Sequence, residues 1–357
     1  MTHLEKLKAA LGGKNPDAVV ITSEVNQRYI SNFPFTDGYV LVTRGESYLV
    51  TDFRYTEAAK AQADKGLTVV APGAMLGFIA EKLAENDCKS VGFEEATLAC
   101  AALDRMKSII SGVEFVSGAS ALIDGLREFK DEDELKYTAQ AQDIADAAFE
   151  HIIKFIKPEM TELEVALELE FFMRRHGAEG VAFETIAVSG SASSMPHGVP
   201  RPVKLEKGFL TMDYGARVNG YCSDMTRTVV LGKADADMKK LYDTVLKAQL
   251  AALEVIEEGA DCRGVDKIAR DIIYGAGYEG CFGHGLGHGV GMYIHEAPRL
   301  SPAAKEGAKL VDGQIVTVEP GIYIEGKYGC RIEDMVCVKP GGKHNFTHSP
   351  KEMIELF

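Results

Sequence analysis

The sequence CFGHGLGHGVGMYIHEAPR at residues 281–299 decides how the C-terminal half of the chain must fold. Five glycines alternate with other residues in this stretch, and it holds three of the chain's nine histidines, His284, His288 and His295. Each glycine costs a helix about 1 kcal/mol relative to alanine, so these histidines cannot form a helical pair. They must lie on extended or looping backbone that passes close to another group. We interpret that group as a pair of metal ions held by the C-terminal half of the chain.

The whole-chain composition limits the classes of function. The chain has 357 residues, which suits two domains. Its net charge of −14 repels phosphate backbones, which argues against a nucleic-acid partner. The N-terminal sequence has no apolar signal region, and no run approaches the ~20 apolar residues of a membrane span. The seven cysteines form no C-x-x-C pair, so we expect reduced thiols and a cytoplasmic protein.

Residues 1–125 alternate strand and helix signals, which predicts a compact α/β domain. Strands are expected at residues 17–22, 38–43, 47–51, 90–93 and 113–117, and helices at residues 55–65, 75–86 and 98–110. No glycine-rich phosphate loop is present. The polar-aromatic clusters at 32–35 and 52–55 are read as turns and rim packing, or as contacts to a substrate or partner subunit.

Residues 126–357 form the second predicted domain, which carries an internal repeat. A charge run at 130–134 begins a helix that extends to about residue 156, and the capping box Thr161-x-x-Glu164 begins another that ends near residue 176. Two further helices are expected at about 236–257 and 262–275. Each pair of helices leads to a hairpin, at 208–230 and at 313–338. The repeat would bring the acidic residues of the two hairpins face to face.

The first hairpin places two aspartates together. Asn219-Gly220 is a strong signal for a type I′ turn with two loop residues. With that turn, Gly215 lies opposite Asp224. Asp213 shares a strand face with Gly215, so the two aspartates become diagonal neighbours within reach of one ion.

The second hairpin places two glutamates together. If its loop centres on Gly326, Glu319 lies opposite Glu333 on one face. Four carboxylates on apolar sheet faces cannot all stay ionised without compensating charge. Arg227 and Arg331 could supply it, but two divalent cations compensate more fully. This donor set suits Mn, Co, Fe or Zn.

The simpler interpretation of each residue is structural. A single Asp in a hairpin is usually a turn or edge residue, Glu-Pro-Gly is usually a turn, and a single histidine is usually a satisfied core residue. The conjunction of four acids and a glycine-flanked histidine is what favours a metal centre.

The motifs that carry these residues resemble those of the pita-bread dimetal peptidases, most closely the Xaa-Pro aminopeptidases and Xaa-Pro dipeptidases (prolidases). The matching segments are Met212-Asp213-Tyr214-Gly215, Cys222–Thr228, Gly283–Glu296, Glu319-Pro320-Gly321-Ile322-Tyr323 and Arg331-Ile332-Glu333-Asp334. The resemblance implies an α/β N-terminal domain followed by an α+β pita-bread (creatinase/aminopeptidase-like) catalytic domain with a pseudo-two-fold repeat.

The resemblance also implies roles for individual residues. It implies five metal ligands, with the second aspartate and the last glutamate bridging: Asp213, Asp224, His288, Glu319 and Glu333. Glu319 would also be the general base toward the bridging water. His197 would hydrogen-bond the substrate, and His295 would stabilise the tetrahedral intermediate. The remaining expected contacts are His284 and Tyr323 near the pocket and Arg331 orienting Glu333. The cofactors would be two divalent ions, with manganese favoured over cobalt and zinc.

The resemblance implies hydrolysis of the peptide bond before proline, and three activities remain open. An Xaa-Pro aminopeptidase acting on small peptides is the first expectation. A strict Xaa-Pro dipeptidase needs a cation for the product-side carboxylate, and Arg299 could supply it. A pita-bread binding module without catalysis is the alternative outside the enzymes. A homodimer is expected in which N-terminal domains help to close the partner's site.

Overall fold

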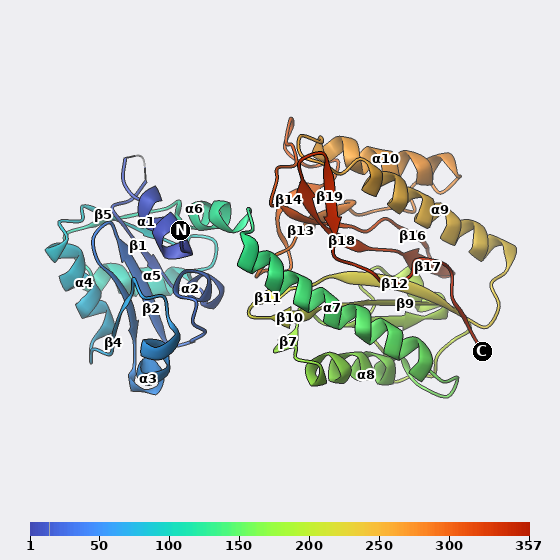
Figure 1. Cartoon of the computed structure of the whole chain (residues 1–357), viewed down its shortest axis with the longest axis horizontal. Coiled ribbons are helices and arrows are strands. Elements are labelled where there is room, and N and C mark those ends of the chain that lie inside the picture. The colour runs from blue at the N-terminus through green and yellow to red at the C-terminus, as the bar shows by residue number, and fades with distance from the viewer. Residues whose placement is uncertain (14) are drawn as a thin grey trace. The chain divides into compact units, whose positions relative to one another are not determined.

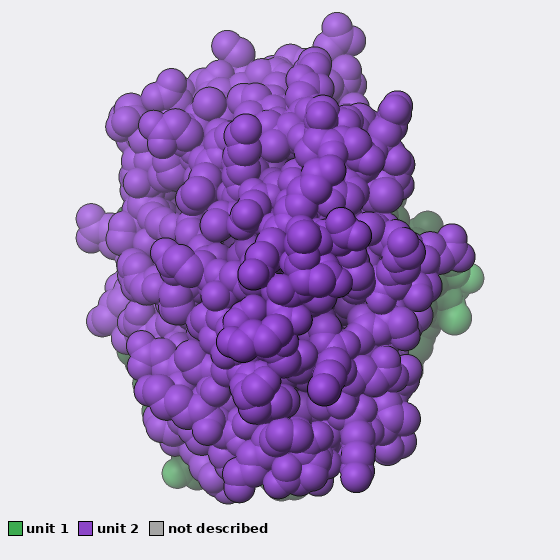
Figure 2. All heavy atoms as spheres, turned by 90° about the vertical axis from the view of Figure 1, so that its right-hand side faces the viewer, with its two compact units in different colours: residues 1–127 green, residues 128–357 purple. Residues whose placement is uncertain are grey.

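In a computed structural model, residues 1–13 and 15–357 are described, and the chain divides into two compact units. These are Met1–Arg127 and Glu128–Phe357, coloured separately in Figure 2. The sequence placed the boundary after residue 125, which lies inside helix α6 (Ala119–Arg127); the observed division follows at the end of that helix. None of the helices in the described ranges has the length and apolar composition of a membrane span.

The first unit is an α/β domain built on one six-stranded sheet, in the order β4-β3-β2-β1-β5-β6. Strand β1 pairs antiparallel with β2 and parallel with β5. Every residue of β1 and β3 is buried, as expected of apolar strands covered on both faces. The strands are β1 Ala18–Ile21, β2 Gly38–Thr43, β3 Ser47–Thr51, β4 Thr68–Val70, β5 Ser90–Phe93 and β6 Glu114–Val116.

The described residues of this unit form six helices: α1 His3–Ala10, α2 Glu24–Ser31, α3 Phe53–Gln62, α4 Met75–Glu85, α5 Cys100–Ile109 and α6 Ala119–Arg127. All eight elements expected from the sequence are present, with small shifts at their ends. The sequence analysis missed β4 and helices α1, α2 and α6. Each of these is short, and short segments show too few periods for their pattern to be recognised.

The second unit repeats one supersecondary pattern twice, as predicted. The first copy runs through α7 (Glu132–Phe155), α8 (Glu162–Arg175), and a set of strands. These strands are β7 Gly180–Val181, β8 Ile186–Ser189, β9 Gly208–Tyr214, β10 Ala216–Val218, β11 Tyr221–Cys222 and β12 Met225–Leu231, with a 3₁₀ turn η1 at Gly190–Ser194. The predicted capping box is present, since Thr161 and Glu164 bond each other's backbone at the start of α8.

The second copy runs through α9 (Ala236–Glu254), α10 (Cys262–Gly275) and strands in the same order. They are β13 Gly287–Gly289, β14 Glu296–Leu300, β15 Ile315–Val318, β16 Gly321–Ile324, β17 Tyr328–Arg331 and β18 Asp334–Lys339, followed by β19 Gly342–Asn345 and β20 Glu355–Leu356. In both copies a long strand is followed by a small hairpin and then by the long strand's partner: β9, β10–β11 and β12 in the first, β15, β16–β17 and β18 in the second.

The two helices of each copy lie against its strands (Figure 1), and an apolar core holds each pair there. One core joins α7 and α8 to β8, β9 and β12 through residues such as Phe149, Leu169 and Leu210. The other joins α9 and α10 to β15 and β18 through residues such as Val245 and Val316. All seven cysteines are free, and only Cys100 and Cys281 among them are not buried.

Both predicted hairpin registers are confirmed. Val218 pairs with Tyr221, and the same register continues through Met225 opposite Tyr214. Asn219 and Gly220 have φ of 49° and 89°, as a type I′ turn requires. In the second hairpin, Gly321 pairs with Arg331 and Val318 with Asp334, which leaves Glu319 and Glu333 opposite each other between these pairs.

Candidate metal centre and substrate pocket

Three carboxylates from both copies of the repeat converge at the middle of the second unit. Asp213 lies near the end of β9, Asp224 just before β12, and Glu333 between β17 and β18. Ligand atoms of all three lie within 4.8 Å of one another. Asp224 and Glu333 are buried, with 5% and 1% of their surface exposed. The two-fold repeat explains the meeting, because it turns the acids of one hairpin toward those of the other.

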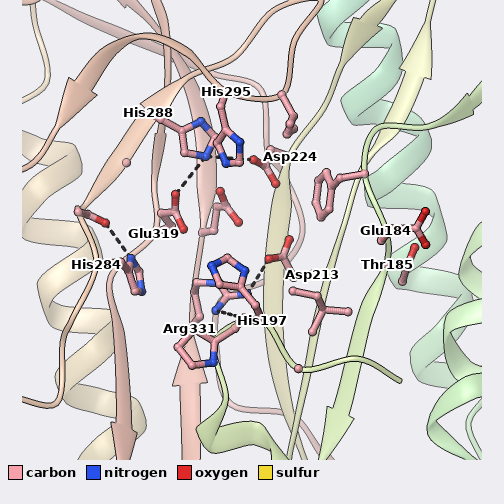
Figure 3. A pocket seen from close by; sticks show the side chains of 18 of the residues that line it. Glu184, Thr185, His197, Asp213, Asp224, His284, His288, His295, Glu319 and Arg331 are labelled. Atoms are coloured by element: carbon pink, nitrogen blue, oxygen red, sulfur yellow. Dashed lines mark hydrogen bonds and ion pairs between the residues drawn. The ribbon is translucent and has the colours of Figure 1, made fainter. Parts of the chain in front are cut away.

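His288 and Glu319 lie against this cluster (Figure 3). His288 Nε2 is 3.6 Å from Asp224 Oδ2 and 3.3 Å from Glu319 Oε1. The backbone N–H of His288 donates to Thr317 Oγ1, which in turn donates to Glu319 Oε1 at 3.1 Å. The structure therefore brings all five sequence-predicted ligands to one place.

The glycines on both sides of His288 are needed for close packing against neighbouring strands, whereas the sequence had suggested that they leave room for the ions. A Cβ on Gly287 would lie 2.0 Å from the carbonyl oxygen of Thr317, and one on Gly289 would lie 2.0 Å from that of Ala297. The predicted close approach exists, but at both positions it is to the backbone of neighbouring strands and not to the ion site. The glycines let β13 pack tightly between β14 and β15, and this packing fixes His288.

Arg331 and Thr226 fix the carboxylates of Asp213 and Glu333 by hydrogen bonds. Arg331 Nη2 donates to Asp213 Oδ2 at 2.6 Å, and its Nε donates to Thr226 Oγ1 at 3.0 Å. Thr226 Oγ1 donates onward to Glu333 Oε2 at 2.6 Å. The expectation that Arg331 orients Glu333 is therefore corrected in detail: its ion pair is with Asp213, and its link to Glu333 runs through Thr226.

The electrostatics of the cluster call for added positive charge. Burial, reinforced by the neighbouring carboxylates, raises the pKa of Asp224 and Glu333 well above the usual range, and burial raises the pKa of Asp213. Asp213 Oδ1 and Glu333 Oε1 are buried and have no hydrogen-bond partner in the described part of the chain. Unpaired buried carboxylate oxygens are costly. The donor set of four carboxylates and one imidazole therefore fits divalent cations.

A cavity of about 660 Å³ opens onto the carboxylate cluster. Its polar lining includes His197, His284, His295 and Arg299, and its apolar walls include Phe183, Ile186, Val199 and Ile294. Figure 3 shows His197 next to Arg331 and His295 next to His288. The rings of His288 and His295 are 4.3 Å apart.

Two of the three cavity-lining histidines from the glycine-rich stretch, His284 and His295, have pKa values lowered toward the neutral form. Desolvation, with smaller contributions from His288 and Arg299, lowers the pKa of His295 to about 4. Burial likewise lowers the pKa of His284. A neutral imidazole at pH 7 can donate one N–H to a substrate oxygen without carrying charge.

Tyr323 and a buried ion pair fix His284. The Nε2 of His284 is 3.1 Å from the Tyr323 hydroxyl, which also accepts from Arg331 Nη1 at 2.6 Å. The backbone around His284 is held from helix α10, where Arg270 pairs with Asp266 and donates to the carbonyl oxygens of Phe282 and His284. Tyr323 thus lies behind His284, as a contact that orients it.

Arg299 lies at the rim of the cavity on β14, directly across from His288 on β13. Within residues 1–13 and 15–357, no carboxylate lies at ion-pair distance from its guanidinium. The cavity therefore has one wall of carboxylates and an uncompensated cation on the strand next to the histidine ligand.

The sequence analysis missed several residues of the site. Thr226 lies inside the matched segment Cys222–Thr228, on strand β12 two residues after Asp224, and pairs with Asp213 on β9; that position could have indicated its role. The apolar wall residues Phe183, Ile186, Val199 and Ile294 carried no signal, because a single apolar residue in a loop or strand looks the same whether it faces a cavity or a core.

Comparisons with known proteins agree with this geometry. The model of metallopeptidase family M24 matches residues 136–340, and that of the Creatinase/Prolidase N-terminal domain matches residues 3–129. An uncharacterized peptidase of Bacillus subtilis is 40% identical over 355 residues, with 99% of both chains covered.

Two solved structures are similar over nearly their whole length. The Xaa-Pro dipeptidase from Bacillus anthracis aligns with a TM-score of 0.95 and 42% identity, covering 99% of each chain. The X-Pro aminopeptidase from Thermotoga maritima aligns with a TM-score of 0.90 and 34% identity, covering 96% of this chain and 98% of the other. With its pita-bread catalytic unit and its converging carboxylates, this chain belongs to metallopeptidase family M24 and carries a Creatinase/Prolidase N-terminal domain.

Proposed function

We propose that this metallopeptidase cleaves the bond between an N-terminal residue and proline, using two divalent metal ions held by five residues: Asp213, Asp224, His288, Glu319 and Glu333. The family implies divalent ions, and the unpaired buried carboxylate oxygens support their binding here. When bound, the ions would activate a water molecule and polarise the scissile carbonyl group. We propose manganese as the physiological metal, with cobalt or zinc as substitutes.

The chain's own groups have distinct roles in this proposal. Glu319 accepts the proton of the attacking water, and that proton passes to the proline nitrogen as the C–N bond breaks. Its carboxylate accepts from the Thr317 hydroxyl at 3.1 Å and lies 3.3 Å from His288 Nε2, which fixes its position beside the cluster. His197 and His295 donate N–H groups to the carbonyl oxygen as negative charge develops on it. Phe183 and Ile186 would contact apolar parts of the substrate.

Arg299 is the observation that favours a dipeptidase. In an Xaa-Pro dipeptide, the proline carboxylate is the free C-terminus, so a cation on the strand beside His288 would fix the dipeptide by that charge. The similarity to the Xaa-Pro dipeptidase from Bacillus anthracis supports the same substrate class. We therefore propose Xaa-Pro dipeptides as the preferred substrates.

Aminopeptidase activity on longer peptides, the first expectation from the sequence, is the second candidate. It is supported by the size of the cavity, about 660 Å³, which exceeds the needs of a dipeptide, and by Val199 at its rim, 77% exposed. The similarity to the Thermotoga maritima aminopeptidase supports it as well. Both candidates use the same centre and differ in what the rim must bind.

The two candidates are separated by Ala-Pro, Ala-Pro-amide and Ala-Pro-Ala, assayed with the wild type and with Arg299→Leu. A dipeptidase cleaves Ala-Pro best, and the variant loses at least about tenfold in kcat/KM on Ala-Pro while Ala-Pro-amide is little affected. Faster cleavage of Ala-Pro-Ala, with no effect of Arg299→Leu on any substrate, would establish the aminopeptidase instead.

The proposal extends to metal content, assembly and location. Elemental analysis of the purified protein and turnover after manganese addition test the enzyme against a non-catalytic binding module. A protein without metal or Xaa-Pro hydrolysis would favour that module. We also propose a homodimer in the cytoplasm, which sedimentation and cell fractionation would check.

A further inference from the structure

A loop of the first repeat, residues 190–200, supplies one side of the substrate cavity. It begins with the 3₁₀ turn η1 and continues through Pro196, His197, Gly198, Val199 and Pro200, all of which line the cavity. Its two ends are Ser189, the last residue of β8, and Arg201. After η1 the loop has a turn bond from the Gly198 N–H to the Met195 carbonyl, and its Pro196 carbonyl accepts from Arg331 Nη1 at 3.3 Å. Beyond these two contacts, its shape depends on how its ends are held.

Both ends are bonded to one buried carboxylate, that of Glu162. Glu162 Oε1 accepts from the backbone N–H and the hydroxyl of Ser189, at 2.8 and 2.9 Å, and from Arg201 Nη2 at 2.7 Å. Its Oε2 accepts from the backbone N–H and Nε of Arg201, at 3.1 and 2.8 Å. Glu162 is fully buried and is the first residue of α8, so the carboxylate is itself fixed by the helix.

The five donors occupy both oxygens of the Glu162 carboxylate. A carboxylate accepts at both oxygens, whereas an amide would present N–H groups to donors at one of them. Glu162→Gln would therefore leave at least two N–H groups facing an N–H₂ group on a side chain that is fully buried. The arrangement is specific for a carboxylate, and it does not touch any of the five candidate metal ligands.

We propose that Glu162 is a positioning residue for the reaction: by clasping both ends of the 190–200 loop, it holds His197 at the distance from the carboxylate cluster that substrate binding requires. The role of His197 in this inference rests on the proposed function. We call the five hydrogen bonds that Glu162 accepts from Ser189 and Arg201 the clasp, and its existence does not depend on the proposed function. The second repeat has a comparable device in Asp266–Arg270, which holds the backbone at His284.

A kinetic double-mutant cycle tests whether Glu162 acts through His197. Glu162→Gln is expected to lower kcat/KM for the Xaa-Pro substrate about 10- to 100-fold, the range found when residues behind a site are changed. His197→Ala should lower it by a similar or larger factor, and the double variant should be no worse than His197→Ala alone, because only one interaction is lost. A residue that merely stabilises the fold would give additive losses, and that result would overturn the proposal, as would unchanged activity of Glu162→Gln.

Glu164→Gln is the matched control on the same helix turn. Glu164 bonds the backbone and hydroxyl of Thr161, is exposed, and does not bond the loop. Glutamine also serves in a capping box, so this variant should retain wild-type kinetics. If Glu162→Gln does not fold, Arg201→Lys replaces it, because Arg201 is partly exposed and the change removes the two-pronged bond while keeping the charge. The same non-additivity with His197→Ala is then expected at a smaller loss.

A fluorescence measurement separates failure of the clasp from failure of the proposed function. The chain contains no tryptophan, so Val199→Trp introduces a single reporter at an exposed position of the loop. In metal-free protein, acrylamide should quench this reporter more strongly when Glu162→Gln is added, and no more strongly when Glu164→Gln is added. Equal quenching in all three proteins would refute the clasp even if the enzyme cleaves Xaa-Pro bonds. A clear difference would support it even if the substrate proved to be another peptide.

Discussion

Thr226→Val is expected to weaken divalent-metal binding by about 10- to 100-fold, although Thr226 is not itself a candidate ligand. Its hydroxyl is buried, donates to Glu333 Oε2 at 2.6 Å and accepts from Arg331 Nε at 3.0 Å. Hydrogen bonds to charged groups contribute about 1.5–3 kcal/mol each. Valine keeps the shape and removes both bonds, so Glu333 and Arg331 lose their shared anchor. The expected loss of affinity corresponds to about 1.4–2.8 kcal/mol.

Isothermal titration of the metal-free protein with Mn²⁺ measures this affinity directly, and Thr228→Val is its control. Thr228 lies two residues along the same strand, is equally buried, and bonds the backbone N–H and carbonyl of Arg331 but no carboxylate. Both variants should lose stability in urea, but only Thr226→Val should lose metal affinity. Equal Mn²⁺ affinity in the two variants would refute the reasoning that the hydroxyl orients Glu333.

Three further outcomes follow from the same structure. Glu319→Ala should lower kcat by about 10²-fold or more, and near-normal turnover would remove Glu319 from the role of base. Chelation should lower the thermal midpoint of the wild type but not of Asp224→Asn, because bound metal stabilises only a folded protein that can hold it. The pH dependence of unfolding tests Glu162. Burial raises the pKa of this carboxyl group, but the hydrogen bonds that it accepts from Arg201 outweigh burial, so its pKa is lowered overall. A depressed carboxylate pKa stabilises the fold above the unfolded value of about 4.3 and loses that contribution as pH falls through the folded value. The free energy of unfolding in urea should therefore fall more between pH 6 and pH 3 in the wild type than in Glu162→Gln, and parallel losses would contradict this assignment.

Much of the metal centre could be predicted from the sequence because turn chemistry is local. Asn219-Gly220 specifies a two-residue turn, and the period of two along a strand then fixes which aspartates share a face. The second hairpin has no such signal, yet its register follows from a loop centred on Gly326, as the observed pairing of Gly321 with Arg331 confirms. The positions of the two turns and the alternation of side chains along a strand therefore placed the four carboxylates correctly within their hairpins.

The partners that hold those carboxylates could not be predicted in the same way. Arg331 was expected to orient Glu333, its neighbour in sequence, but its guanidinium reaches Asp213 in the other repeat. The glycines around His288 were interpreted as room for the ions, whereas they admit the backbones of β14 and β15. In both cases the contact is made by another strand, and the pattern of residues within one strand carries no information about which strand packs against it.

The sequence by itself determined the helix starts of the second unit, the two hairpins and the set of acids that must lie together, because capping, turn type and side-chain alternation act over a few residues. Only the tertiary structure decided how the glycine-rich stretch at residues 281–299 is used. There the two repeats meet, His288 turns toward the carboxylates, and His295 and Arg299 face a cavity whose other side is a loop clasped by Glu162. That arrangement depends on burial and on contacts between segments far apart in the chain, which exist only once both repeats have folded against each other.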